Sequence, residues 1–120
     1  MLFRSSRTAL FIVDSDPRTS HKPAEAIRIA AGVGAWKKVS VTLYLRGEAV
    51  RALAEWVDDL IEEDNFTRYL PILKDFGKPI YVQKGAAALG DLGEATMPYE
   101  EIGDEQLARM AGENEMTLRF

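Results

Sequence analysis

The chain has 120 residues, of which 47% are hydrophobic and 28% charged, with a net charge of −4 and no cysteine. This length suits one compact domain with its own core, and we expect a single domain over residues 1–120. The missing cysteine excludes disulfides, thiolate metal sites and a cysteine nucleophile, and a single histidine excludes a multi-histidine metal centre. The acidic balance gives no reason to expect nucleic-acid binding.

Charge is uneven along the chain, since residues 1–51 hold nine Lys or Arg against four Asp or Glu, and residues 52–120 hold six against fifteen. We favour solvated helix faces over a dipolar surface for self-association. Met1–Val13 is interrupted by arginines and serines, so it lacks the apolar middle of a signal peptide. No apolar run approaches the roughly 20 residues of a membrane span. We therefore expect a soluble cytoplasmic protein that contacts no membrane.

The first part of the chain predicts strand, helix and strand. The apolar run Ala9–Val13 stops abruptly at Asp14–Pro17, which is typical of a strand covered on both faces in a parallel sheet. Pro23–Ala31 begins with proline and is rich in alanine, which predicts a helix that packs close to a sheet. Apolar and polar residues alternate over Val39–Leu45, and this period of two predicts the clearest strand.

Two helices are expected next. Apolar residues recur at helical spacing over Val50–Ile61, with acidic residues opposite, and the spacing returns over Phe66–Leu73. Because Pro71 is unfavourable deep inside a helix, we expect the second helix to start or kink near Tyr69. Gly77 is a natural helix stop.

The last part of the chain has weaker patterns. Pro79–Val82 predicts a short strand, and residues 84–103 predict a long loop with a short helix. A helix capped by Asp104 is expected to reach Met110, with Gly112 past its end. Alternation over Met116–Phe120 predicts a final strand.

This alternation of strands and helices indicates an α/β fold, a three-layer α/β/α sandwich around a mostly parallel sheet of four or five strands with flavodoxin-like winding. Ligands bind such sheets beyond the carboxyl ends of the strands. We therefore expect residues 14–16, 46–48 and 83–85 to converge on one edge. No residue is predicted to be catalytic. The candidate ligand-binding residues are Asp14, Ser15, His21, Arg46, Gly47, Glu48, Gln83, Lys84 and Gly85.

Two families of phosphoryl-transfer proteins place acidic residues after an apolar first strand, as this chain does. Asp14-x-Asp16 after an apolar strand is similar to the motif of haloacid dehalogenase phosphatases, but the residues that follow depart from that family's Asp-Gly-Thr. A structural role is favoured, since Asp side chains hydrogen-bond to the backbone that follows them in turns. A response-regulator receiver needs an aspartate after its third strand, where this chain has Gln83-Lys84, and is rejected.

Other features have simple structural explanations. The small-residue segment Lys84–Gly93 could hold an anion through backbone amides, but it matches no phosphate-binding motif and a surface loop is favoured. His21 precedes a helix in a polar segment and is expected to be exposed. Four aromatic residues at helix positions are expected in the core or at a subunit interface: Trp36, Trp56, Phe66 and Tyr69.

Three segments together suggest a family. They are the strand and Arg-Gly-Glu-Ala-Val of Val41–Val50, the alanine-rich helix Ala24–Ala31, and the strand and loop Pro79–Gly85. In this order and composition they resemble segments of the DsrE/DsrF/TusBCD-like sulfur-relay proteins, the DsrE family. The resemblance covers roughly residues 7–93, and it implies a compact α/β/α domain that assembles into dimers, trimers or hexamers.

The resemblance also implies where a cysteine is missing. Active members pass sulfane sulfur to another protein through a cysteine, which would fall near Gln83 or Lys84. Neither an amide nor an ammonium group can carry a persulfide, because relay needs a nucleophilic sulfur. We therefore expect a non-catalytic DsrE-like subunit or partner-binding protein in sulfur relay or sulfur metabolism. It would need no cofactor or metal, and it would form a homo- or hetero-oligomer with DsrE-like subunits.

A second class of function stays open. The loops after the strands could bind a small anionic or nucleotide-like ligand, or carry an enzyme activity that does not depend on cysteine. Asp14, His21, Arg46 and Glu48 would then surround the ligand, and Lys84 would supply a compact cation. Alternatively, residues 84–103 form only a contact between subunits.

Overall fold

A computed structural model describes residues 7–120. Residues 1–6 lie outside the described part of the chain, so the expectation for Met1–Val13 rests partly on residues that the structure does not describe. The elements in chain order are β1 (Arg7–Val13), α1 (Lys22–Ala35), β2 (Val39–Leu45), the 3-10 helix η1 (Gly47–Leu53), α2 (Glu63–Asp75), β3 (Ile80–Gln83), the 3-10 helix η2 (Ala87–Asp91), β4 (Tyr99–Ile102), α3 (Asp104–Glu113) and β5 (Met116–Arg119).

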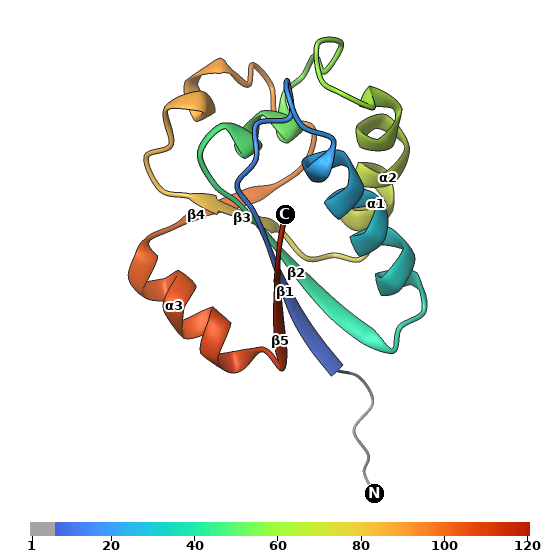
Figure 1. Cartoon of the computed structure of the whole chain (residues 1–120), viewed down its shortest axis with the longest axis vertical. Coiled ribbons are helices and arrows are strands. Elements are labelled where there is room, and N and C mark those ends of the chain that lie inside the picture. The colour runs from blue at the N-terminus through green and yellow to red at the C-terminus, as the bar shows by residue number, and fades with distance from the viewer. Residues whose placement is uncertain (1–6) are drawn as a thin grey trace, which may run out of the picture.

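The sheet has five strands in the order β4-β3-β2-β1-β5, and every neighbouring pair is parallel. In Figure 1, α1 and α2 lie on one side of this sheet and α3 lies on the other. The connections from β1 to β4 therefore wind in one direction, and the return through α3 places β5 beside β1. The predicted α/β/α sandwich with a parallel, doubly wound sheet is confirmed.

The larger core lies between the sheet and the α1–α2 layer. The face of α1 that contacts it carries alanines and one larger residue, Ile27, all at most 2% exposed. These small side chains let α1 approach the sheet closely, as predicted. The end of α1 is equally close to α2, because a β-carbon on Gly34 would lie 2.6 Å from Cε2 of Phe76.

The opposite face has a smaller core. Leu10, Tyr44 and Ile102 are buried there beneath α3, which itself contains no fully buried residue. Tyr44 is in the strand that alternation predicted most clearly, yet it is fully buried because the sheet is covered on both faces.

The expected helix over Val50–Ile61 is wrong. The chain forms η1 and then turns and irregular segments until α2 begins. Most of its apolar residues are buried, whereas Trp56 and Ile61 are exposed. The backbone bonds to distant segments: Glu55 N–H donates to Leu92 O (2.8 Å) and Ile61 N–H to Pro17 O (2.9 Å). The apolar spacing therefore reflected burial and not a continuous helix.

Several boundaries also differ from expectation. Helix α2 begins at Glu63, six residues before Tyr69, and contains Pro71 in its interior. The loop expected over 84–103 contains η2 and also a strand, β4, whose Glu100 and Glu101 are exposed and hide its alternation. Helix α3 begins at Asp104 with Gly103 as its N-cap, and it continues past Met110 through Gly112 to Glu113. The final strand is confirmed.

The aromatic residues divide between core and surface. Phe66 is buried, and Tyr69 packs partly buried against the main core. Trp36 and Trp56 are 72% and 73% exposed, so a core position is wrong for both. Trp36 follows the last turn of α1, and Trp56 lies in the irregular segment after η1. Among the described helices, none combines the length and apolar character needed to cross a membrane.

Candidate functional site

The loops after β2 and β3 meet at the carboxyl edge of the sheet, as expected for parallel strands. The side-chain Oε1 of Gln83 accepts a hydrogen bond of 2.9 Å from Gly47 N–H. Gly47 has φ of +59°, where a β-carbon would be strained, so glycine allows the turn that points this N–H toward β3. Arg46 N–H donates to Val13 O at 2.8 Å, which ties the same loop to β1.

Five charged residues form a continuous network beside these loops, which we call the Arg18 cluster: Asp16, Arg18, Glu48, Arg51 and Asp91. Arg18 Nη2 lies 2.9 Å from Asp16 and 2.8 Å from Glu48. Arg51 contacts Glu48 at 2.8 Å and Asp91 at 3.0 Å. Hydrogen bonding from Arg18 lowers the pKa of the Asp16 carboxyl, and the same contact raises the pKa of Arg18. The cluster thus joins the loops after β1, β2 and β3 through paired charges.

Sequence reasoning selected Glu48 but missed Arg18 and Arg51. The available signals were local, because Arg18 is two residues after Asp16 and Arg51 is three residues after Glu48. A spacing of three residues on a helix brings such a pair together. The long-range contact between Arg18 and Glu48 had no local signal.

Arg46 points to the other face of the sheet. Its Nη1 donates to Tyr44 Oη (3.2 Å) and lies 3.3 Å from Asp104 at the start of α3. Burial raises the pKa of Tyr44, and the nearby Arg46 opposes this shift. Arg46 therefore links β2 to α3, and its guanidinium is already paired.

Asp14 and Ser15 lie at the switch between β1 and β5, where the two winding directions diverge. Ser15 Oγ donates to Phe120 O (2.7 Å), and Arg119 Nη2 donates to Asp14 Oδ2 (2.6 Å). Open sheets usually bind ligands in the crevice at this point. Here the chain's own C-terminal residues contact the two predicted site residues.

Lys84 follows β3, and its backbone and side chain differ in their contacts. Lys84 is exposed, and within residues 7–120 it takes part in no salt bridge. The backbone N–H of Lys84 donates to Ile102 O (3.0 Å), and the backbone N–H of Gly85 donates to Glu101 Oε1 (3.1 Å). Gly85 adopts φ of +76°, so glycine suits this turn. Both amides are already used within the protein.

His21 stands apart from the Arg18 cluster in its contacts. It is the exposed N-cap residue of α1, and its Nδ1 lies 3.5 Å from Oε2 of Glu25 one turn later. This exposure agrees with the sequence expectation. Within residues 7–120, no group of three or more His, Asp or Glu side chains is arranged to hold a metal ion.

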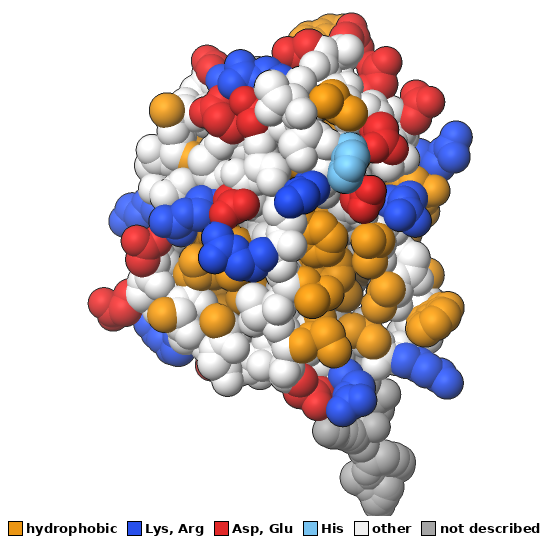
Figure 2. Space-filling model, viewed as in Figure 1, with side chains coloured by type: hydrophobic (Ala, Val, Ile, Leu, Met, Phe, Trp, Pro, Cys, Tyr) orange, Lys and Arg blue, Asp and Glu red, His pale blue; other side chains and the backbone are white. Residues whose placement is uncertain are grey.

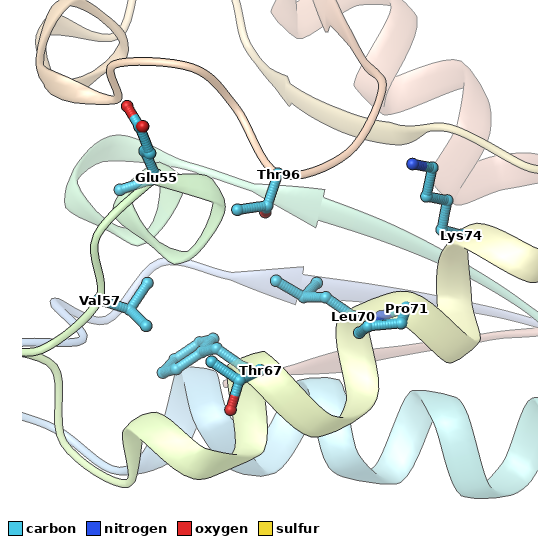
Figure 3. Close-up of a pocket in the computed structure, with 9 residues that line it drawn as sticks. Glu55, Val57, Thr67, Leu70, Pro71, Lys74 and Thr96 are labelled. Atoms are coloured by element: carbon cyan, nitrogen blue, oxygen red, sulfur yellow. The ribbon is translucent and has the colours of Figure 1, made fainter.

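Two cavities formed by described residues include none of the nine candidate residues. A cavity of about 290 Å³ opens between α2 and the segment after η1 (Figure 3), with Val57 and Leu70 among its apolar lining and Glu55 and Lys74 at its rim. Another, of about 380 Å³, lies near the amino end of β2 and includes Lys78, whose pKa is lowered by burial. Sequence patterns signalled neither cavity.

Comparison with known proteins gives a likeness of fold. No protein-family model matches the chain, and no curated protein matches it by sequence. Among solved structures, the crystal structure of the ychN protein from E. coli superposes with a TM-score of 0.77 and 18% sequence identity. The match covers 95% of this chain and 99% of that one. This likeness supports a DsrE-like fold for the chain.

Proposed function

We propose that the chain is a non-catalytic DsrE-like subunit that acts by binding a protein partner in sulfur relay or sulfur metabolism. The fold and the resemblance of three sequence segments support the family. The sequence contains no cysteine, so it offers no side chain that could carry a persulfide.

The contact between Gln83 and Gly47 carries this proposal. The active family members would place a reactive cysteine near Gln83 or Lys84, at the end of β3. In this chain the Gln83 side chain instead holds the loop after β2 through a 2.9 Å hydrogen bond. An amide in this position has a structural use and no nucleophilic one, which suits a subunit that kept the loop arrangement without the chemistry.

The surface at this edge suits a macromolecular partner better than an enclosed ligand. Its arginines are paired with carboxylates, and neither of the two cavities described above reaches it. Lys84 is exposed, and the amide of the next residue, Gly85, bonds the exposed acidic side chain of Glu101. Such alternating, exposed charges select a partner by complementarity and guide its approach.

The test is affinity capture from the source cell with wild type, Lys84→Glu and a control, Arg68→Glu. The control makes the same charge change at an exposed position of α2. We expect a partner that carries a persulfide-forming cysteine, detected by persulfide labelling, to be retained by wild type and Arg68→Glu. Lys84→Glu should lose it. Equal capture by all three variants, or no sulfur-handling partner, would contradict the proposal.

A small-anion binder is the second candidate, and the Lys84 ammonium, which has no ion-pair partner among residues 7–120, favours it. A bound anion would raise the melting temperature of wild type through linkage. Thermal shift with inorganic phosphate and sulfate should then show stabilisation that Lys84→Ala removes and Arg68→Ala keeps. The same melting temperatures with and without these anions would exclude this candidate for both ions.

A further inference from the structure

We infer that β5 is a dimerisation edge, at which two copies of the chain pair their β5 strands antiparallel about a two-fold axis. The inference rests on the proposal that the chain is a subunit of an assembly, and it identifies the partner subunit as a second copy of the chain. The result would be one continuous sheet across both copies. Three independent features of β5 support this inference: its backbone, its apolar face and its charges.

Among residues 7–120, no strand pairs with the outer side of β5. β5 is the edge strand beside β1, and all four of its residues are exposed. Phe120 N–H donates to Ile12 O at 2.8 Å. Because backbone groups alternate in direction along a strand, the N–H and C=O of Thr117 and Arg119 face away from β1. Such unpaired groups form a template for another strand.

The other sheet edge is protected. β4 carries Glu100 and Glu101 at its centre, and both are exposed. Charged residues on an edge strand oppose pairing with another copy. β5 has a single charge, at its last residue Arg119, and its other residues are Met116, Thr117 and Leu118.

The apolar side chains of β5 lie on the α1 side of the sheet. Met116 and Leu118 are 46% and 43% exposed, in register with Ala9 and Phe11 of the main core. The ring of Phe120 packs 5.1 Å from that of Phe11. Figure 2 shows hydrophobic side chains gathered on the surface between β5 and α1. An antiparallel two-fold pair would place α1 of both copies on the same face, so this apolar surface would be buried from both sides.

Two charged residues, Arg119 in β5 and Glu115 directly before it, are complementary across a two-fold axis. Within one copy Glu115 pairs with Arg7 and Arg119 with Asp14, and the two side chains keep 43% and 69% of their surface exposed. With Thr117 at the two-fold axis, Glu115 would lie opposite the partner subunit's Arg119, and Met116 opposite the partner subunit's Leu118. Opposite charges directly across two antiparallel strands are favourable, and like charges are unfavourable. In this register the two-fold axis repeats each contact, which gives two ionic and two apolar contacts. The same surface is used by both copies, as in an isologous interface.

The experiment measures native mass by light scattering. Wild type is expected at twice its 13.4 kDa. Thr117→Pro removes an outward N–H, which an edge strand tolerates, so the fold should persist by circular dichroism while the mass falls to that of a monomer. Ile72→Glu, an equally drastic change at an exposed apolar residue of α2, should stay dimeric.

A charge exchange tests the register itself. Glu115→Arg and Arg119→Glu each put like charges opposite one another in both pairs, so each alone should dimerise roughly tenfold more weakly than wild type or worse. Mixed together, the two variants pair only opposite charges and should recover the dimer. Glu113→Arg and Arg109→Glu make the same changes on exposed α3 and should dimerise like wild type, alone or mixed.

The outcomes separate this inference from the proposed function. A monomeric wild type would overturn dimerisation through β5. The proposed partner binding would still be tested separately by affinity capture with the Lys84 variants. A dimer that survives Thr117→Pro and both charge variants also overturns the β5 edge, although it leaves an assembling protein. A mixture that associates no better than its components would contradict the proposed register.

Discussion

At the scale of single residues, ion pairs and hydrogen bonds between loops hold the carboxyl edge of the sheet together. Arg18 bridges two loops through Asp16 and Glu48, and Gln83 bonds the Gly47 backbone. Exposed ion pairs contribute little to stability individually. Their value here lies in orientation, because each contact joins segments that follow different strands and so limits how the loops can move.

One of these pairs predicts a pH effect. The pKa of Asp16 lies below its ordinary 3.8 because Arg18 donates hydrogen bonds to the ionised carboxylate. The contact therefore stabilises the fold fully above that ordinary value, and this contribution is lost as the pH falls through the lower pKa of the folded state. In Arg18→Ala, the pKa of Asp16 should rise toward its ordinary value in a carboxyl NMR titration. Arg68→Ala should leave it unchanged, and an unchanged pKa in Arg18→Ala would contradict the assignment.

At the scale of elements, α2 shows how tertiary packing overrides a local preference. Pro71 lies inside the helix, at an exposed position between buried Leu70 and Leu73. Proline has no N–H, so the carbonyl of Thr67 loses its usual helical partner. The helix persists because Phe66, Leu70 and Leu73 contribute buried side chains to the main core.

This exception predicts a stabilising substitution. Pro71→Ala would restore the N–H for Thr67 at an exposed site, and should raise the free energy of unfolding by roughly 1–3 kcal/mol, less what alanine adds to the entropy of the unfolded chain. Denaturant titration measures the change. Ile72→Ala, at the neighbouring exposed residue, serves as a control with little expected effect. A Pro71→Ala protein no more stable than wild type would show that the helix is not strained there.

At the scale of the whole molecule, the two faces of the sheet are unequal. The α1–α2 side holds most of the buried apolar residues, whereas α3 covers three buried residues with half-buried side chains. Segments with few buried contacts open at lower cost than the global unfolding free energy. The molecule therefore combines a well-packed layer with a more weakly held one.

Hydrogen exchange should detect this asymmetry. We expect the interior amides of α3, over residues 108–111, to exchange faster than those of α1 over residues 27–31, after correction for intrinsic rates. The small α3 core makes local opening cheaper there. Equal protection in the two helices would mean that α3 unfolds only with the whole domain.

Local patterns predicted most of the elements. The apolar run Ala9–Val13 and the alternation over Val39–Leu45 identified strands, because a covered strand needs such side chains wherever it lies in the sheet. The same reasoning failed over Val50–Ile61, because apolar spacing reports burial and the backbone there found partners in distant segments. The sequence pattern did not predict β4, because its two central residues are acidic and exposed and so break the alternation of apolar and polar residues.

The sequence by itself determined the alternation of strands and helices, the convergence of loops on one edge and the lack of a sulfur nucleophile, since these follow from composition and local order. Only the tertiary structure decided that Gln83 bonds Gly47, that Arg18 joins Glu48 and that β5 lies open beside β1. These contacts join residues that are far apart in the chain, and strand order depends on which helix crosses which face. No local pattern encodes either choice.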